Sequence, residues 1–203
     1  IPLRLVGSEM CIRDSDQPGR AEKIELKLPD GVVMVNAPAD TTISDLLDRG
    51  DIDGFMAPRA PSGAARSNPA IGWLFDDPTA TAKDYYRRTG IFPIMHVLGV
   101  RKELAERHPW LPAALFKAFS LAKAAALDKL DDTSATKVTL PFVEEQLRAA
   151  RQTMGPDYWS YGVADNLPTL EAFTRHHHAQ GLSARHVPVS ELFHPGTYET
   201  YKI

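Results

Sequence analysis

The segment Tyr85–His96, which reads YYRRTGIFPIMH, constrains this chain most, because it sets a charged cluster directly before an apolar run. Arg87 and Arg88 carry planar, permanently charged groups that suit carboxylates. His96 closes the run, and histidine is the side chain that exchanges a proton most readily near neutral pH. A strand that leaves this cluster and enters a core would place cations and a proton carrier at the edge of a cleft. The same pattern also fits a surface arginine pair at a helix end and a core histidine on a strand.

The residues around this segment predict a helix over residues 81–88 that ends near Gly90, followed by a strand over residues 90–100. Pro93 cannot donate a hydrogen bond to a neighbouring strand, so it restricts this strand to a sheet edge or a crossing point.

An earlier stretch predicts a helix followed by a buried strand, the repeating unit of open α/β sheets. Thr42 or Ser44 can cap the helix, Gly50 can end it, and the strand covers Ile52–Ala57. In such sheets, ligands bind beyond the carboxyl ends of the strands. The chain that leaves this strand is Pro58–Ser62, PRAPS.

Arg59 is the second candidate in this pattern, because prolines on both sides limit the freedom of its backbone. An arginine held at a strand end suits a substrate carboxylate, and Ser62 adds a hydroxyl group. A solvated loop arginine is the alternative.

The remaining sequence predicts mainly helices joined by loops. Loop 63–78 contains Trp73, Leu74 and Phe75 as anchors, and a long helix that starts near Trp110 carries an apolar face. The expected members of that face are Leu115, Phe119, Ala122 and Ala126. The other expected elements are strands at 23–28 and 32–35, a helical turn at 104–107, helices at 141–154 and 167–180, and a turn at 190–193.

Two further segments are rich in aromatic residues or histidine. Loop 157–163, DYWSYGV, either lines a cleft with aromatic rings or is a surface loop pinned by Trp159. His176, His177 and His178 point about 100 degrees apart on a helix, so they cannot converge on one metal ion. We therefore expect no metal site at these histidines, although carboxylate ligands elsewhere remain possible. We also expect no cofactor.

Composition describes an ordinary water-soluble chain of 203 residues, with 43% hydrophobic and 24% charged residues. A net charge of -3 gives no reason to expect nucleic acid or a membrane as partner. The single cysteine excludes a disulfide within the chain. The composition is compatible with a monomer and with a homo-oligomer.

The sequence of the first residues indicates that they are not part of the natural protein. Val6–Ser15, VGSEMCIRDS, matches the translation of transposase-end adapter DNA used in sequencing libraries. We therefore interpret residues 1–15 as translated adapter, which has no part in the fold. A genuine short strand, IPLRLV, followed by a loop is the alternative. The true N-terminus would then be missing, and with it any signal peptide.

Four segments together resemble the 4,5-dihydroxyphthalate decarboxylase family, over about Glu22 to Ile203. They are Ile52–Ser62 (IDGFMAPRAPS), Tyr85–His96, Arg101–Phe119 (RKELAERHPWLPAALFKAF) and Gly181–Phe193 (GLSARHVPVSELF). That family is similar in turn to the type II periplasmic substrate-binding proteins of ABC importers.

The resemblance implies an α/β fold with two lobes. Residues 16–90 would be part of lobe two and residues 91–203 the carboxyl part of lobe one, with the N-terminal part of lobe one missing. Ile91–His96 would be one of the two crossings between the lobes.

The resemblance also implies an activity, the non-oxidative decarboxylation of 4,5-dihydroxyphthalate to protocatechuate and carbon dioxide. A substrate-binding protein that captures a small carboxylate for an importer is the alternative. The first activity predicts a cytoplasmic protein and the second a periplasmic one.

For the decarboxylase we expect Arg59 and Arg87 or Arg88 to hold the substrate carboxylates and His96 to donate the proton. The further candidates are Tyr85 or Tyr86 as fallback proton donor, and Ser62 and Thr89 as additional substrate contacts.

Overall fold

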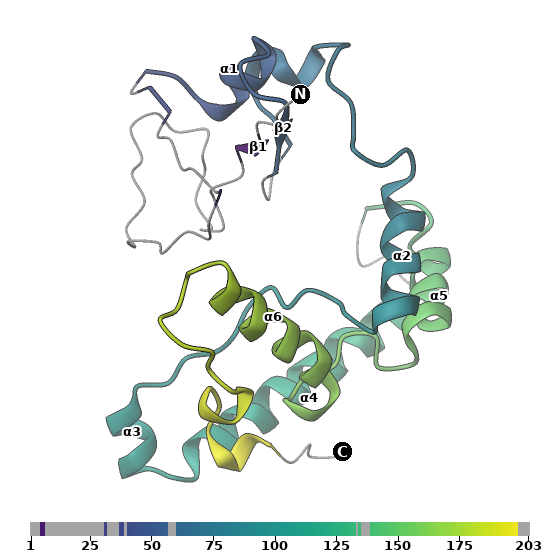
Figure 1. The fold of residues 1–203 in the computed structure, drawn as a ribbon. Coiled ribbons are helices and arrows are strands. Elements are labelled where there is room, and N and C mark those ends of the chain that lie inside the picture. Colours follow the sequence, from purple (N-terminus) through teal and green to yellow (C-terminus); the bar gives the residue numbers. More distant parts are fainter. Residues whose placement is uncertain are drawn as a thin grey trace. The chain divides into compact units, whose positions relative to one another are not determined.

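The computed structural model describes residues 5–6, 31, 37–38, 40–56, 60–132, 134 and 139–198. This part of the chain is mostly helical (Figure 1). The chain divides into two compact units, one of Ile1–Asp76 with Gln180–Leu182, the other of Asp77–Ala179 with Ser183–Ile203. The predicted lobe boundary after residue 90 differs from this division and stays a prediction.

The first unit is built around helix α1, Ile43–Asp48, which the sequence predicted. The Thr42 side chain accepts a hydrogen bond from the Asp45 backbone N–H, and the Asp45 carboxylate accepts one from the Thr42 N–H. This reciprocal capping box satisfies two backbone donors that the helix leaves free. Ser44 is buried, and its hydroxyl oxygen accepts a hydrogen bond of 3.0 Å from the Ser62 N–H.

Strand structure in the described residues is limited to two short segments of this unit. β1, Leu5–Val6, pairs in parallel with β2, Gly54–Phe55, and the 3-10 helix η1, Gly63–Ser67, packs on α1. The predicted strand 52–57 is therefore shorter than expected, and the predicted strands 23–28 and 32–35 lie outside the described residues. β1 falls within the segment interpreted as adapter, and that interpretation stays a prediction.

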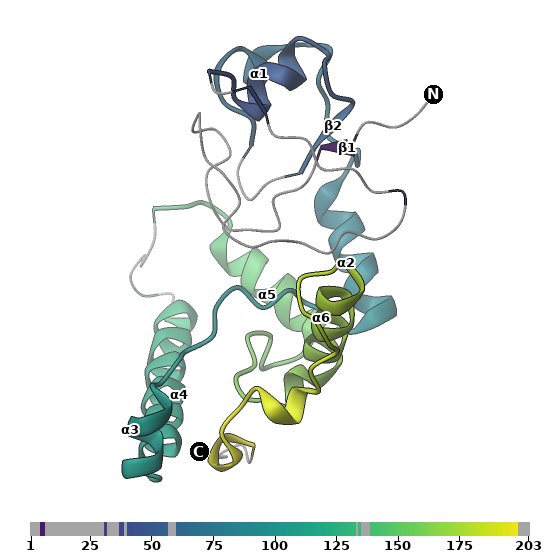
Figure 2. The same cartoon turned by 60° about the vertical axis from the view of Figure 1, so that its left-hand side comes forward.

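The second unit contains five α-helices and three 3-10 turns within the described residues. They are α2 (Pro78–Thr89), α3 (Lys102–Arg107), α4 (Leu111–Asp131), α5 (Val143–Met154), η2 (Ala164–Asn166), α6 (Leu167–Ala179), η3 (Val189–Glu191) and η4 (Pro195–Thr197). α2 packs beside α5 in both ribbon views (Figure 2). The helices predicted at 81–88, 104–107, 141–154 and 167–180 are confirmed within a few residues at their ends.

A small apolar core holds the carboxyl-terminal part of this unit. Val163, Leu170 and Val189 are buried together, and Phe193 and Tyr198 pack against them. The Tyr198 hydroxyl donates a hydrogen bond of 2.9 Å to the carbonyl of Ser190. The core therefore joins α6 to the turns that follow it.

The strand predicted over residues 90–100 is wrong: the chain from residue 91 to 100 has no regular secondary structure. Its side chains are largely exposed, with Met95 at 66%, Val97 at 70% and Leu98 at 61%. A strand needs a partner for its backbone groups, and within the described residues this segment has none. Apolar composition alone therefore did not determine the local structure.

Two packing predictions are also corrected. Trp73 and Leu74 are 77% and 87% exposed, so they do not anchor their loop. On α4, Phe119 is 49% exposed, and the exposed residues include Ala122 and Ala126. Lys123, by contrast, lies on the side of the helix that faces the rest of its unit, where its ammonium group pairs with the Asp157 carboxylate.

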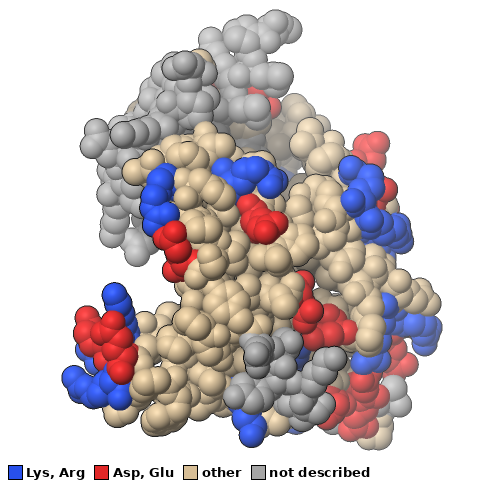
Figure 3. Space-filling model, turned by 60° about the horizontal axis from the view of Figure 1, so that its bottom comes forward, with Lys and Arg blue, Asp and Glu red and all other residues tan. Residues whose placement is uncertain are grey.

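No helix among the described residues is long and apolar enough to cross a membrane. On the face shown in Figure 3, lysine and arginine alternate with aspartate and glutamate, and wide areas carry neither. The described part of the chain is thus mainly helical, and the two-lobed α/β arrangement belongs to the proposals below.

Candidate functional site

The arginine cluster lies at the carboxyl end of α2. Gly90 ends this helix with a φ of 66°, and its N–H donates a hydrogen bond of 2.7 Å to the Tyr86 carbonyl. Glycine adopts this left-handed conformation without a steric penalty. The chain therefore leaves the helix immediately after Arg87, Arg88 and Thr89.

The side chains at this helix end differ in the hydrogen bonds and ion pairs that they form. Arg88 forms an exposed ion pair of 2.9 Å with Asp84, one turn earlier, while Arg87 is exposed. The Thr89 hydroxyl donates to the Tyr85 carbonyl at 2.7 Å and accepts from the Ile91 N–H at 3.1 Å. Thr89 thus shapes the helix end, and its predicted role as a substrate contact stays a prediction.

His96 lies in the irregular segment that follows, and it is exposed. Its ring has no hydrogen-bond partner within the described residues, so no neighbouring side chain fixes its orientation there. The alternative of a core histidine on a strand is therefore wrong. Tyr86, the fallback donor, is half-buried on α2.

The other predicted contacts belong to the first unit. Arg59 lies outside the described residues. Ser62 is exposed just before η1, and its side chain makes no capping hydrogen bond there. The structure does not place the two units relative to one another, so a cleft shared by Arg59 and His96 stays a prediction.

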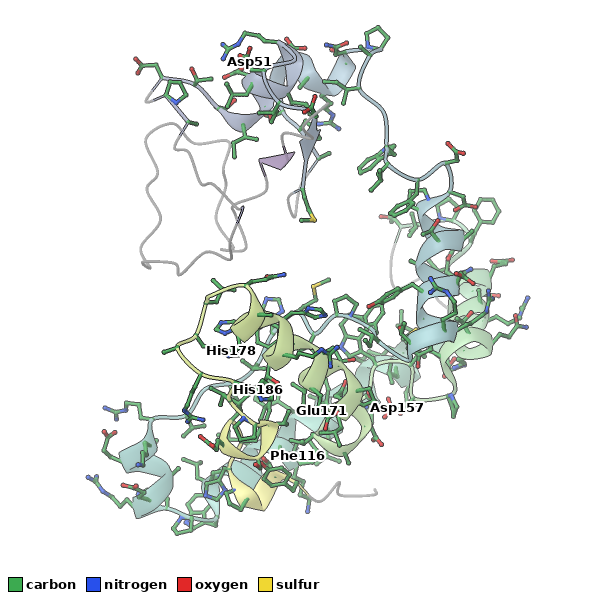
Figure 4. The ribbon with its side chains drawn as sticks, viewed as in Figure 1. Asp51, Phe116, Asp157, Glu171, His178 and His186 are labelled. Atoms are coloured by element: carbon green, nitrogen blue, oxygen red, sulfur yellow. The ribbon has the colours of Figure 1, made fainter. Side chains whose placement is uncertain are left out.

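Lys123 organises the loop after α5, a structural role that the sequence did not predict. The side chain of Lys123, on α4, is only 16% exposed. Its Nζ donates to both carboxylate oxygens of Asp157, at 2.8 and 3.0 Å, and to the Trp159 carbonyl at 3.2 Å. It also lies 4.9 Å from the centre of the Tyr161 ring, a cation–π contact. We call residues 157–163 the aromatic loop; Figure 4 labels Asp157.

Asn166 fixes the same loop at its other end. The side-chain amide of Asn166 donates hydrogen bonds to the carbonyls of Ser160, at 3.1 Å, and Gly162, at 2.9 Å. The prediction that Trp159 pins the loop into the core is wrong, because its side chain is 47% exposed. Polar contacts from Lys123 and Asn166 hold the loop instead.

The aromatic loop touches the segment that carries His96. The rings of Phe92 and Trp159 meet edge to face, with their centres 5.7 Å apart and their planes at 65°. This geometry is the one that aromatic pairs prefer. The structure therefore brings together two of the sequence patterns singled out above, the arginine–histidine segment and the aromatic loop.

The histidines at the end of α6 point to different neighbours, as the helical spacing predicted. The His177 ring packs on Phe173, whereas the His178 ring lies 6.4 Å from that of His186 (Figure 4). His178 Nδ1 lies 3.1 Å from the Ser183 carbonyl. Within the described residues, no group of three or more potential metal ligands is assembled.

Two further arginine–carboxylate pairs lie in the second unit. Arg151 binds both oxygens of Asp131 at 2.7 and 2.6 Å, and these hydrogen bonds hold the pKa of Asp131 below its ordinary value. Arg185 binds Glu191 in the same manner and lowers the pKa of that carboxyl. Both are exposed pairs that join chain segments of the second unit.

Comparison with known proteins confirms the resemblance that the sequence predicted. The chain is 57% identical over 188 residues to a 4,5-dihydroxyphthalate decarboxylase of Comamonas testosteroni, an alignment that covers 93% of this chain and 57% of that protein. It is 43% identical over 72 residues to the 4,5-dihydroxyphthalate decarboxylase of Pseudomonas putida, covering 36% of this chain and 28% of that protein. No protein-family model matches the chain. The chain thus spans less than two thirds of the length of the curated relatives it matches.

Proposed function

We propose that this protein catalyses the non-oxidative decarboxylation of 4,5-dihydroxyphthalate, which yields protocatechuate and carbon dioxide. The observation that carries the proposal is the 57% identity to a relative named for this substrate and activity. A soluble enzyme of this kind would work in the cytoplasm, on a small aromatic dicarboxylate.

The chemistry defines what the site must supply. The ring carbon that bears the departing carboxylate takes up a proton, and the bond to that carboxylate then breaks and releases carbon dioxide. The hydroxyl group para to this carbon can feed electron density into it. The site therefore needs a proton donor, cations for the carboxylate that stays, and a drier region for the one that leaves.

For the cations we assign Arg59 together with Arg87 or Arg88, with Ser62 and Thr89 as further contacts. A guanidinium group binds a carboxylate through two parallel hydrogen bonds, which a lysine does not reproduce. The exposure of Arg87 and the exposed pairing of Arg88 with Asp84 support this assignment, because both guanidinium groups can reach a ligand without breaking a buried contact.

For the proton donor we assign His96, with Tyr86 as the fallback. An exposed imidazole without a partner in the described residues can turn toward a ligand. Tyr86 is half-buried on α2, and an ordinary phenol is a weak acid at neutral pH.

We further propose the two-lobed α/β architecture of type II periplasmic-binding proteins. Residues 16–90 would form part of lobe two and residues 91–203 the carboxyl part of lobe one. In this arrangement, Ile91–His96 crosses between the lobes, which agrees with a segment that has no regular structure of its own.

The test is an assay of carbon dioxide release with 4,5-dihydroxyphthalate and the full-length protein from the source genome. We expect release of one carbon dioxide for each protocatechuate formed. A protein that binds the compound in calorimetry and releases no carbon dioxide would refute the proposal and support a substrate-binding role in an importer.

A further inference from the structure

Phe92 and Trp159 form an aromatic pair on the surface of the second unit. Their rings are in edge-to-face contact, yet Phe92 is 39% and Trp159 is 47% exposed. Aromatic side chains of this size contribute most when they are buried. A pair that keeps its internal contact and remains half open therefore offers ring surface to a flat ligand.

The position of Phe92 links this pair to the proposed chemistry. Phe92 comes four residues after Arg88 and four residues before His96. Four residues of chain span at most about 14 Å, so the Phe92 backbone lies within that distance of the backbones of Arg88 and His96. Phe92 thus belongs to the same short segment as the proposed cation and the proposed proton donor.

Lys123 supports the aromatic pair and does not bind the ligand itself, because the donors of its ammonium group already have partners within the protein. Its ammonium group has three N–H donors, and Asp157, the Trp159 carbonyl and the Tyr161 ring surround it. With only 16% exposure, it is not available to a ligand carboxylate. Its contacts hold the backbone that carries Trp159.

We infer that Phe92 and Trp159 form a stacking surface for the aromatic ring of the substrate, and that Lys123 is the positioning residue that holds Trp159 against Phe92. The inference rests on the proposed function, because that function supplies an aromatic dicarboxylate as ligand. It names a contact for the ring, whereas the arginines serve the carboxylates.

The first test compares two ligands on the full-length wild-type protein by calorimetry. Phthalate and cis-cyclohexane-1,2-dicarboxylate carry the same two carboxylates, and only phthalate has a flat aromatic ring. We expect phthalate to bind about 3- to 10-fold more tightly, the range of one aromatic contact. Equal affinity for the two ligands would overturn the inference without any variant.

The second test asks whether Trp159 is the source of that preference. W159L should reduce the ratio of the two affinities to about 1, and W159F should keep most of it. W110L is the matched control, because Trp110 is 65% exposed at the start of α4 and packs on His108 instead. A preserved ratio in W159L, with circular dichroism like that of the wild type, would contradict the assignment.

The third test addresses Lys123 as a positioning residue. K123M should lower the phthalate preference as W159L does and also reduce the near-ultraviolet circular dichroism of the aromatic residues. R185Q, which breaks an exposed ion pair elsewhere in this unit, should change neither. A K123M protein that keeps the preference would remove Lys123 from the inference. The failure of the decarboxylase proposal stays distinguishable, because ligand binding is measured without carbon dioxide release.

Discussion

Two irregular segments of the second unit meet at one aromatic contact, and they are held in different ways. From residue 92 to 100, we find no hydrogen bond to the part of the chain that the structure describes, and large apolar side chains are exposed. From residue 157 to 166, Lys123 and Asn166 bind backbone carbonyls from both ends. In these two segments, polar side chains from other elements hold the chain, and apolar composition alone does not.

The largest expected effect concerns the loosely held segment. If His96 donates the proton, H96Q should reduce turnover by about 10²- to 10⁴-fold and change substrate affinity little. Steady-state kinetics of the full-length enzyme, with calorimetry for binding, measure both. H194Q is the control, because His194 lies in the turn before η4 and binds the Gly196 N–H. Full turnover in H96Q would move the proton donor to another residue, with Tyr86 next.

The second prediction concerns the anchored loop. K123M should lower the free energy of unfolding by about 1–3 kcal/mol, because the Trp159 carbonyl and the Asp157 carboxylate lose a shared donor. Urea denaturation of the full-length protein measures this change. R185Q, at an exposed pair, should cost much less than K123M. Equal losses in the two variants would show that the loop is not held by Lys123.

Two glycines, Gly90 and Gly99, test whether the end of α2 is held more firmly than the segment that follows it. G90A should cost about 1 kcal/mol, because alanine is strained at a φ of 66° although no atom lies within 4 Å of the added Cβ. Gly99 has equally open surroundings and no left-handed φ, so G99A should be neutral or slightly stabilising. Thermal unfolding of both variants tests this, and similar shifts in melting temperature would contradict the role of the α2 end.

The smallest effect is a dependence on pH. Hydrogen bonds from Arg151 lower the pKa of Asp131 in the folded state, so the pair stabilises the fold above the ordinary pKa of the carboxyl group. This stability is lost as pH falls through the lowered pKa. D131N should therefore be less stable than the wild type at neutral pH, and the difference should vanish in acid. A difference in stability that is constant from pH 7 to pH 2 would exclude this linkage.

The helices were predictable because their signals are local. Thr42, Gly90 and Gly155 mark helix ends through capping geometry that depends on a few neighbouring residues. Segment 91–100 was mispredicted because a strand depends on a partner, which its own sequence does not specify. On α4, the spacing of apolar residues predicted a face of which Leu115 is half-buried, whereas Phe119, Ala122 and Ala126 are exposed.

The candidate site was predictable only in part. The helix that presents Arg87 and Arg88 follows from the sequence, and so does the resemblance to the decarboxylases. The role of Lys123 was not foreseen, since its partner Asp157 is 34 positions away and no local pattern connects them. The aromatic composition of the loop was the single signal that pointed to this part of the chain.

The exposed side chains of residues 92–98 have a consequence for the behaviour of the protein in concentrated solution. Phe92, Ile94, Met95, Val97 and Leu98 make this stretch the kind of sequence that joins neighbouring molecules into cross-β aggregates. Pro93 interrupts it, because its ring removes one backbone donor and disrupts the stacking of identical strands. We therefore expect Pro93, in the segment that carries His96, to work against self-association of the chain.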